Sequence, residues 1–224
     1  QLAEILGMDK ETVLQKITAD QAFVWLKRKA DFDKAEEVKE ADLSGIHIIQ
    51  ETQRFYPQGV LASHILGFAG IDNQGLEGIE KSCDEELKGV DGSIVTEYDA
   101  QSREIPQSTQ RYNAPTDGYT LVLTIDKTLQ YFAERELDKL MNSETPPKGC
   151  SILMMNPKTG EILAMASRPT YDPNNYGNYT QEDLRNKCVV DTYEPGSTFK
   201  MIISAAALEE GIVTPESRFY DPGY

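Results

Sequence analysis

The 224-residue sequence has few of the residues and patterns that mark several common classes of protein. It contains no run approaching the eighteen or so consecutive apolar residues of a membrane span. Basic side chains number 22 against 37 acidic ones, a formal charge of -15, which argues against nucleic acid as a partner. The first residues, Gln1 to Glu4, show neither an initiator methionine nor a signal peptide. We therefore expect the natural protein to continue before them.

Cysteine and histidine are also scarce. Cys83, Cys150 and Cys188 are an odd number without the spacing of a metal site, so at least one is unpaired within the chain. We expect packed thiols, although an extracytoplasmic location would permit a disulfide. The two histidines, His47 and His64, lie far in sequence from the serine discussed below. A spatial Ser-His-Asp triad stays open, but nothing near either histidine suggests one, and we expect structural or surface roles.

What the sequence does contain is an ordinary globular composition, with 26% charged and 39% hydrophobic residues. Its length suffices for one large or two small domains. A polar, turn-forming cluster at Asn113–Gly118 is the clearest boundary between periodic segments.

The strongest chemical signal is the stretch 193–200, Tyr-Glu-Pro-Gly-Ser-Thr-Phe-Lys. The Pro-Gly turn precedes Ser197, which can cap a helix that runs to about Glu210 and stops at Gly211. Lys200 then lies one helical turn after Ser197 on the same face, so its amine can take the proton of the hydroxyl. The pattern predicts a serine nucleophile with a lysine base.

A lysine acts as a base only where burial or neighbouring cations lower its pKa, so this mechanism needs dry surroundings. The run from Met201 to Leu208 is apolar on every side of a helical wheel, which predicts a helix buried all round. The Ser-x-x-Lys spacing alone arises about once by chance in a chain of this length. A helix cap beside an exposed lysine is the alternative interpretation.

The motif stands among other short stretches that carry a resemblance: Thr124–Asp126 with Gln130, Asn156–Met165, Arg168–Pro169, Asp172–Asn174, Asn186–Asp191 and Tyr193–Lys200. Together they resemble the class B penicillin-binding proteins, the D,D-transpeptidases that cross-link peptidoglycan, and within them the division and sporulation type. The resemblance implies Ser197 as nucleophile and Lys200 as general base, with no cofactor and no metal.

The resemblance also implies an α+β fold in two parts. Residues 1–113 would form a mixed pedestal, the dimerisation domain, and residues 114–224 an incomplete penicillin-binding transpeptidase domain related to the serine β-lactamases. The family's Ser-x-Asn and Lys-Thr-Gly elements do not occur after Lys200. We therefore expect a piece of a longer enzyme, inactive alone, whose remainder is absent or a separate chain. The alternative is a nicked or truncated form that pairs with a second copy.

The leading functional hypothesis is acyl transfer to peptidoglycan stem peptides ending in D-Ala-D-Ala, with β-lactams as inhibitors. The resemblance implies an N-terminal transmembrane anchor, an extracytoplasmic location, and partners such as a membrane glycan polymerase and division or sporulation proteins. Two alternatives remain. A serine β-lactamase is disfavoured because such enzymes lack a pedestal, and a non-catalytic interaction module or β-lactam sensor would place the function in residues 1–113.

Patterns of apolar residues predict the elements around these motifs. Arg54 is expected to form a structural ion pair, and the stretch 171–180 to be a loop. Helical segments are predicted over 1–43, 60–68, 75–87, 181–190 and, after a cap at Asp126, about 127–141. Strands are predicted over 46–54, 93–98, 119–125 and, as a hairpin, 150–155 and 161–166.

Overall fold

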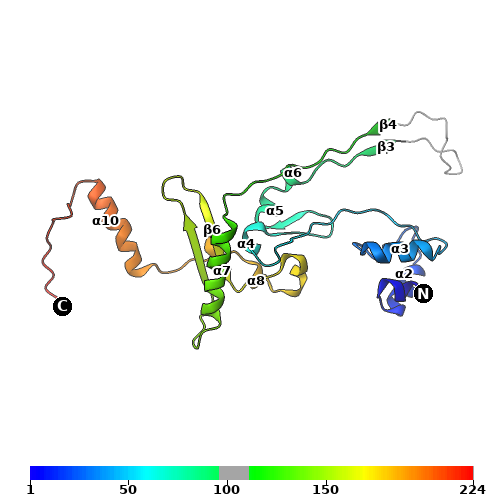
Figure 1. Ribbon diagram of the computed structural model, residues 1–224, viewed down its shortest axis with the longest axis horizontal. Coiled ribbons are helices and arrows are strands. Elements are labelled where there is room, and N and C mark those ends of the chain that lie inside the picture. Colours follow the sequence, from blue (N-terminus) through cyan, green and yellow to red (C-terminus); the bar gives the residue numbers. More distant parts are fainter. Residues whose placement is uncertain (96–110, 224) are drawn as a thin grey trace. The chain divides into compact units, whose positions relative to one another are not determined.

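The computed structural model describes residues 1–95 and 111–223, in two compact units, Gln1–Cys188 and Val189–Tyr224. Helices and short strands alternate along the chain (Figure 1), which confirms the predicted mixed α+β class. The helices are α1 (Leu2–Leu6), α2 (Lys10–Ile17), α3 (Phe32–Glu40), α4 (Ser63–Leu66), α5 (Gly78–Ser82), α6 (Asp84–Leu87), α7 (Lys127–Met141), α8 (Gln181–Leu184), α9 (Lys187–Val190) and α10 (Phe199–Glu209). The 3-10 helices are η1 (Pro173–Asn178) and η2 (Gly196–Thr198). The strands are β1 (Phe68–Ala69), β2 (Gly75–Glu77), β3 (Ser93–Val95), β4 (Arg111–Asn113), β5 (Cys150–Met155) and β6 (Ile162–Arg168).

The first hydrophobic cluster lies among α1, α2 and α3. Its buried residues are Leu2, Leu6, Val13 and Val38. The Asp9 carboxylate caps α2 by accepting a hydrogen bond from the Thr12 amide at 3.0 Å. Helical structure is thus confirmed for parts of the segment 1–43 but wrong for residues 18–31, which form a loop. Lys16 Nζ donates hydrogen bonds to the backbone oxygens of Trp25 and Leu26, and these bonds stabilise the loop conformation.

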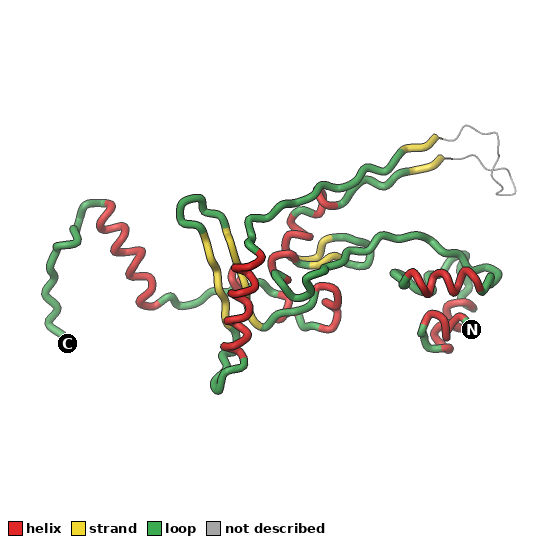
Figure 2. Tube along the Cα trace, in the orientation of Figure 1, coloured by secondary structure: helices red, strands yellow, loops and turns green. Residues whose placement is uncertain are grey.

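The predicted strand over 46–54 is wrong. Figure 2 draws this segment as loop, and the structure assigns it no strand partner. Its alternating sequence satisfies the side-chain pattern of a strand, but a strand also needs a neighbour to pair with its backbone. Within the described residues, His47–Gln50 form no backbone hydrogen bond.

A tight junction of two glycines follows. Helix α4 confirms the predicted helix around 60–68, and β1 pairs antiparallel with β2, Phe68 lying opposite Glu77. Gly67 has a φ of 74°, and a Cβ placed on it would lie 1.7 Å from the Glu77 carbonyl oxygen. A Cβ placed on Gly78, whose φ is 59°, would lie 2.5 Å from the Gly67 nitrogen and 2.6 Å from the Ile65 carbonyl oxygen. Only glycine permits this approach of two backbones.

The segments that end at residue 95 and begin at residue 111 pair with each other. β3 runs antiparallel to β4, with Ser93 opposite Asn113, and Val90 forms a bridge with Thr116. The strand predicted over 93–98 is confirmed as far as Val95; its last three residues lie outside the described residues. The predicted domain boundary between 113 and 114 therefore falls in a paired segment, and it stays a prediction.

Helix α7 packs on the hairpin of β5 and β6, as Figure 1 shows. The register runs from Cys150 opposite Arg168 to Met155 opposite Ile162. The buried residues of this second cluster are Ala133, Leu137, Ala164 and Ala166. The Asp126 carboxylate caps α7 by accepting hydrogen bonds from the amides of its first turn at 2.8 and 2.9 Å. The predicted helix, its cap and the hairpin are all confirmed.

The predicted strand over 119–125 is wrong. Among the described residues, two hydrogen bonds join the end of this segment and its neighbour Asp126 to β6: Thr124 Oγ1 donates to the Ile162 carbonyl at 2.7 Å, and the Asp126 amide donates to the Leu163 carbonyl at 2.8 Å. Two contacts at one end do not make a ladder, so the branched residues before them remain loop.

A third cluster joins segments that are distant in sequence. It consists of Tyr56, Phe68, Tyr171 and Leu184. Tyr171 is fully buried, and its hydroxyl donates to the Ser63 carbonyl at 2.9 Å. The stretch 171–180, predicted as a loop, includes η1 and packs as a structural connector. Residues 181–190, predicted as one helix, form the two short helices α8 and α9.

Candidate functional site

Ser197 and Lys200 lie in one helical segment of the second unit. Ser197 is the middle residue of η2, and α10 begins two residues later at Phe199, so Lys200 falls in its first turn. Residues three apart in a helix share a face. The predicted helix is therefore present and places both residues on one side of it, whereas their chemical roles stay predictions.

The turn before this helix depends on glycine. Gly196 has a φ of 53°, in the left-handed region that glycine adopts without steric cost. Thr198, not Ser197, is the N-cap residue of α10, and its hydroxyl donates to the Pro195 carbonyl. The expectation that Ser197 caps the helix is thus wrong. Its hydroxyl makes no capping bond to the helix.

The far end of α10 confirms the predicted stop. Gly211 has a φ of 67°, its amide donates to the Leu208 carbonyl at 3.1 Å, and the Ile212 amide donates to the Ala207 carbonyl at 3.0 Å. These two bonds form a Schellman motif, which requires a left-handed residue after the helix.

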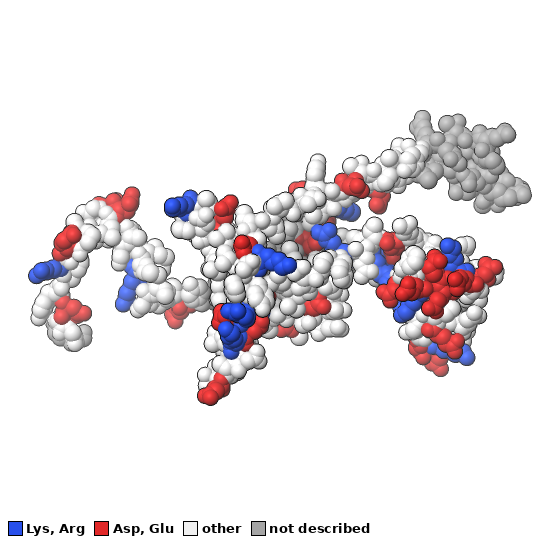
Figure 3. Space-filling view, in the orientation of Figure 1, with Lys and Arg blue, Asp and Glu red and all other residues white. Residues whose placement is uncertain are grey.

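The apolar side chains of α10 are exposed, contrary to the prediction of a helix buried all round. Met201 is 71% exposed and Ile202 61%, and Ser197 and Lys200 are exposed as well. Figure 3 shows few charged side chains on this helix, whereas acidic ones gather over α3. The described residues therefore do not supply the dry surroundings that a lysine base needs.

The segment that leads toward this helix is anchored to the hairpin in the first unit. Asn186 Nδ2 lies 3.3 Å from Met165 Sδ, and the Cys188 thiol lies 3.5 Å from the Ala166 carbonyl oxygen, to which it can donate. Burial raises the pKa of the Cys188 thiol, so this cysteine is a packed thiol and not a reactive one. All three cysteines are free.

A buried polar network lies behind the hairpin, and the sequence analysis did not find it. Glu134 accepts hydrogen bonds from Gln130 Nε2 at 2.8 Å and from the Ala62 amide at 2.7 Å, and Arg168 Nη2 lies 3.2 Å from its other oxygen. Arg168 also binds Asp138 at 2.5 and 3.0 Å. The network connects residue 62 to α7 and β6. Its only signal in the sequence is a pair of polar residues, 130 and 134, one turn apart beside the apolar stripe of the helix.

The two histidines and Arg54 lie outside any catalytic arrangement. His64 is buried, and its Nε2 donates to the Asp183 carbonyl at 2.8 Å. Burial lowers the pKa of His64, which favours the neutral ring. Arg54 pairs with Glu80 at 2.6 Å, which confirms the expected structural ion pair. His47 is exposed on the segment after α3.

Among the residues that the structure describes, no group of acidic, cysteine or histidine side chains is arranged to hold a metal ion. None of the described helices combines the length and apolar character that crossing a bilayer requires.

Comparison with known protein families identifies the family of this chain. Residues 1–123 match the model of the penicillin-binding protein dimerisation domain, and residues 150–224 match the model of the penicillin-binding protein transpeptidase domain. The first match alone covers more than half of the chain. The chain belongs to the class B penicillin-binding proteins.

Individual relatives agree with this assignment. The chain is 43% identical over 229 residues to stage V sporulation protein D of Bacillus subtilis, covering all of this chain and 35% of that protein. It is 35% identical over 218 residues to the peptidoglycan D,D-transpeptidase FtsI of Escherichia coli, covering 96% of this chain and 37% of FtsI. The chain thus spans little more than a third of the length of these curated relatives.

Solved structures give the same result for the fold. The crystal structure of penicillin-binding protein 2X from Streptococcus thermophilus matches with a TM-score of 0.63 and 30% identity, over 96% of this chain and 34% of that one. A peptidoglycan synthetase from Bifidobacterium adolescentis matches over the whole chain and 41% of its own, with a TM-score of 0.69 and 26% identity.

Proposed function

We propose that the protein to which this chain belongs is a peptidoglycan D,D-transpeptidase that works through a serine acyl-enzyme. The proposal is supported chiefly by the position of Ser197 and Lys200, three residues apart in one helical segment, inside the span that matches the transpeptidase model. The relative FtsI of Escherichia coli is named a peptidoglycan D,D-transpeptidase, which supports the same reaction.

In this mechanism Ser197 Oγ attacks the carbonyl carbon of the penultimate D-alanine of a stem peptide, and Lys200 Nζ takes the hydroxyl proton. The bond to the terminal D-alanine breaks, and that residue leaves with a proton on its amine. An amine of a neighbouring stem then attacks the ester, forms the cross-link and releases Ser197. A β-lactam acylates the same oxygen because its strained amide imitates the peptide.

The wider setting is proposed on the same basis. The protein would act on the extracytoplasmic face of the membrane, held there by an N-terminal helix, beside a membrane glycan polymerase and division or sporulation proteins. The rest of the transpeptidase domain, which would complete the site around Ser197, would come from further residues of the same protein or from a second chain.

Covalent labelling tests the proposed roles. In a protein that extends over the relatives' full length, a fluorescent penicillin should label the wild type and Ser204→Ala, a control serine on the same helix. Ser197→Ala should abolish labelling. Lys200→Arg should slow labelling by a factor of about 100 or more, because a guanidinium stays protonated and therefore cannot accept the hydroxyl proton. Undiminished labelling of Ser197→Ala would remove the assignment, and rapid nitrocefin turnover would favour a β-lactamase.

A non-catalytic interaction module is the second candidate, and the exposure of Ser197 and Lys200 in this chain favours it. Its test is binding of the chain to a purified membrane glycan polymerase, compared between the wild type and Ser197→Ala. Equal binding together with an absence of penicillin labelling in the full-length protein would support this function over catalysis.

A further inference from the structure

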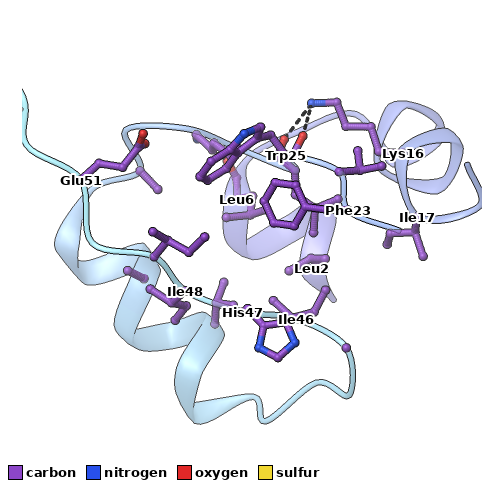
Figure 4. A pocket seen from close by; sticks show the side chains of 18 of the residues that line it. Leu2, Leu6, Lys16, Ile17, Phe23, Trp25, Ile46, His47, Ile48 and Glu51 are labelled. Carbon is purple, nitrogen blue, oxygen red and sulfur yellow. Dashed lines mark hydrogen bonds between the residues drawn. The ribbon is translucent and has the colours of Figure 1, made fainter. Parts of the chain in front are cut away.

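A groove of about 660 Å³ lies across the N-terminal helices. Its floor is the first hydrophobic cluster, through Leu2 and Leu6. Figure 4 shows Phe23 and Trp25 pointing into it from one side and Ile48 from the other. All residues that line it belong to the first 53 residues of the chain, so it is complete within the first unit.

The walls of this groove expose large apolar side chains. Phe23 is 55% exposed, Trp25 40%, Ile48 50% and Ile49 52%. A contiguous apolar surface of this kind, bordered by polar residues, is typical of a binding site.

Unpaired peptide groups along one wall of the groove favour a ligand in an extended conformation. Between His47 and Gln50, no peptide N–H or C=O forms a hydrogen bond with the described residues. An extended peptide beside this wall would supply both donors and acceptors, as a strand added to an open edge does. A helical ligand would not, because its own backbone groups are already paired.

Three lysines around the groove favour a ligand with acidic residues at its ends. Lys16, Lys27 and Lys29 line it, and their ammonium groups donate to neutral oxygens, such as the Leu6 carbonyl 2.7 Å from Lys27 Nζ. None of the three forms an ion pair within the described residues, whereas Glu51 is neutralised by Arg28. The side chains that line the groove therefore include three lysines and one acidic residue, Glu51, and this local excess of basic groups complements acidic side chains of a ligand.

We propose that this groove binds an extended segment of a partner protein by strand addition along residues 47–50. Alternate apolar side chains of that segment fill the space above Leu2 and Leu6, and its acidic residues lie beside the three lysines. This role goes beyond the proposed transpeptidase reaction and does not depend on it.

Peptide selection identifies the ligand class without assuming a partner. A displayed library of random peptides about twelve residues long is selected on the 224-residue chain, after depletion on Ile48→Asp. The enriched peptides should alternate apolar and polar residues and carry aspartate or glutamate at their ends. Failure to enrich any sequence, or enrichment of apolar residues at helical spacing, would overturn the proposal.

Binding of one selected peptide, followed by fluorescence anisotropy, tests the geometry. Trp25→Ala should weaken binding about tenfold or more, while Tyr119→Ala, an exposed aromatic residue outside the groove, should not change it. N-methylation of alternate peptide nitrogens should abolish binding, because it removes the donors of the added strand. Added salt should weaken it several-fold. An unchanged affinity after N-methylation contradicts strand addition.

Two further measurements separate the remaining outcomes. The Tm of the Ile48→Asp variant should match that of the wild type, since the Ile48 side chain is half exposed. If its Tm is lower, the Trp25→Ala variant replaces it in the depletion step of the peptide selection. Sedimentation of the chain alone should show a monomer. A dimer that Ile48→Asp dissociates would overturn the proposal in favour of a second copy of this chain in the groove.

Discussion

Glu134 is a charged residue that the fold buries almost completely, with 6% of its surface exposed. Burying a carboxylate is costly unless its oxygens are paired, and here three donors satisfy them, from Gln130, Ala62 and Arg168. Burial disfavours the Arg168 guanidinium ion, but the hydrogen bond to Asp138 and the charge of Glu134 outweigh it and raise the pKa of Arg168. Each charge of the network therefore depends on the others.

Glu134→Gln should lower the free energy of unfolding by roughly 2–4 kcal/mol, because it leaves Arg168 buried with one carboxylate fewer. The matched control is Glu136→Gln on the same helix. Glu136 pairs with Arg135 and Lys139 in solvent, so its loss should leave the free energy of unfolding nearly unchanged. Urea unfolding measures the free energy of unfolding of both variants. Equal decreases would show that the buried network stabilises the fold no more than the exposed ion pairs do.

His64 gives the protein a pH dependence of defined sign. Burial lowers its pKa in the folded state, and the positive charges of Arg168 and Lys187 act in the same direction. The unfolded chain gains this proton at about pH 6.5 and the folded one only at lower pH. The stabilising effect of His64 is thus complete above that pH and is lost as the pH falls below it.

We therefore expect the free energy of unfolding to decrease between pH 7.5 and 5.5, by at most about 1.4 kcal/mol per pH unit from this residue. The measurement is urea unfolding across this range for the wild type and His64→Gln. The variant should show a shallower slope. A steeper slope in the variant, or stability that rises on acidification only when His64 is present, would reverse the assignment.

At the scale of elements, backbone approach decides where the chain tolerates change. Gly67 has a ψ of -153° as well as its positive φ, a combination that residues with a side chain avoid. Gly67→Ala would also press a methyl group into the Glu77 carbonyl. We expect it to lower the free energy of unfolding by about 3 kcal/mol or more.

The control for this substitution is Gly177→Ala in η1, where a Cβ meets nothing within 4 Å and the φ is not in the left-handed region. Its effect should stay within about 0.5 kcal/mol. Chemical denaturation compares the two variants. A tolerated Gly67→Ala would mean that the junction of β1 and β2 can move apart.

The sequence predicted those elements whose signals are local. A cap at Asp126, apolar residues at helical spacing and two short apolar runs around a glycine turn were enough for α7 and the hairpin. The strands predicted over 46–54 and 119–125 failed because pairing is decided by neighbours, which side-chain alternation does not specify. For the site, the motif gave the position of Ser197 and Lys200. It could not give the network of Glu134, whose members only the fold brings together.

At the scale of the whole molecule, residues on both sides of the predicted boundary at residue 113 pack against each other. Tyr56 and Phe68 share a core with Tyr171 and Leu184, and the Ser63 hydroxyl lies 2.9 Å from that of Thr170. The part that matches the dimerisation domain and the part that matches the transpeptidase domain therefore stabilise each other. A substitution in one part should therefore change the stability of the other, as at the contact between Ser63 and Thr170.

The exposure of α10 leads to the last prediction, which concerns the 224-residue chain by itself. Its candidate nucleophile and base both face solvent, and Met201, Ile202 and Ile203 beside them are more than half exposed. Acylation needs a water-poor site with fixed hydrogen-bond donors for the developing oxyanion. We expect a fluorescent penicillin to label this chain at least about 100-fold more slowly than a protein of the relatives' full length.

The control for this comparison is Ser197→Ala in both proteins, which removes the label from the longer one and leaves the shorter one unchanged. The chain should also bind a hydrophobic dye, and Ile203→Glu should reduce that binding because it interrupts the exposed apolar surface. Rapid labelling of the chain at Ser197 would contradict the prediction. It would mean that the turn at Gly196 and the first turn of α10 are enough to activate the serine, without a surrounding cleft.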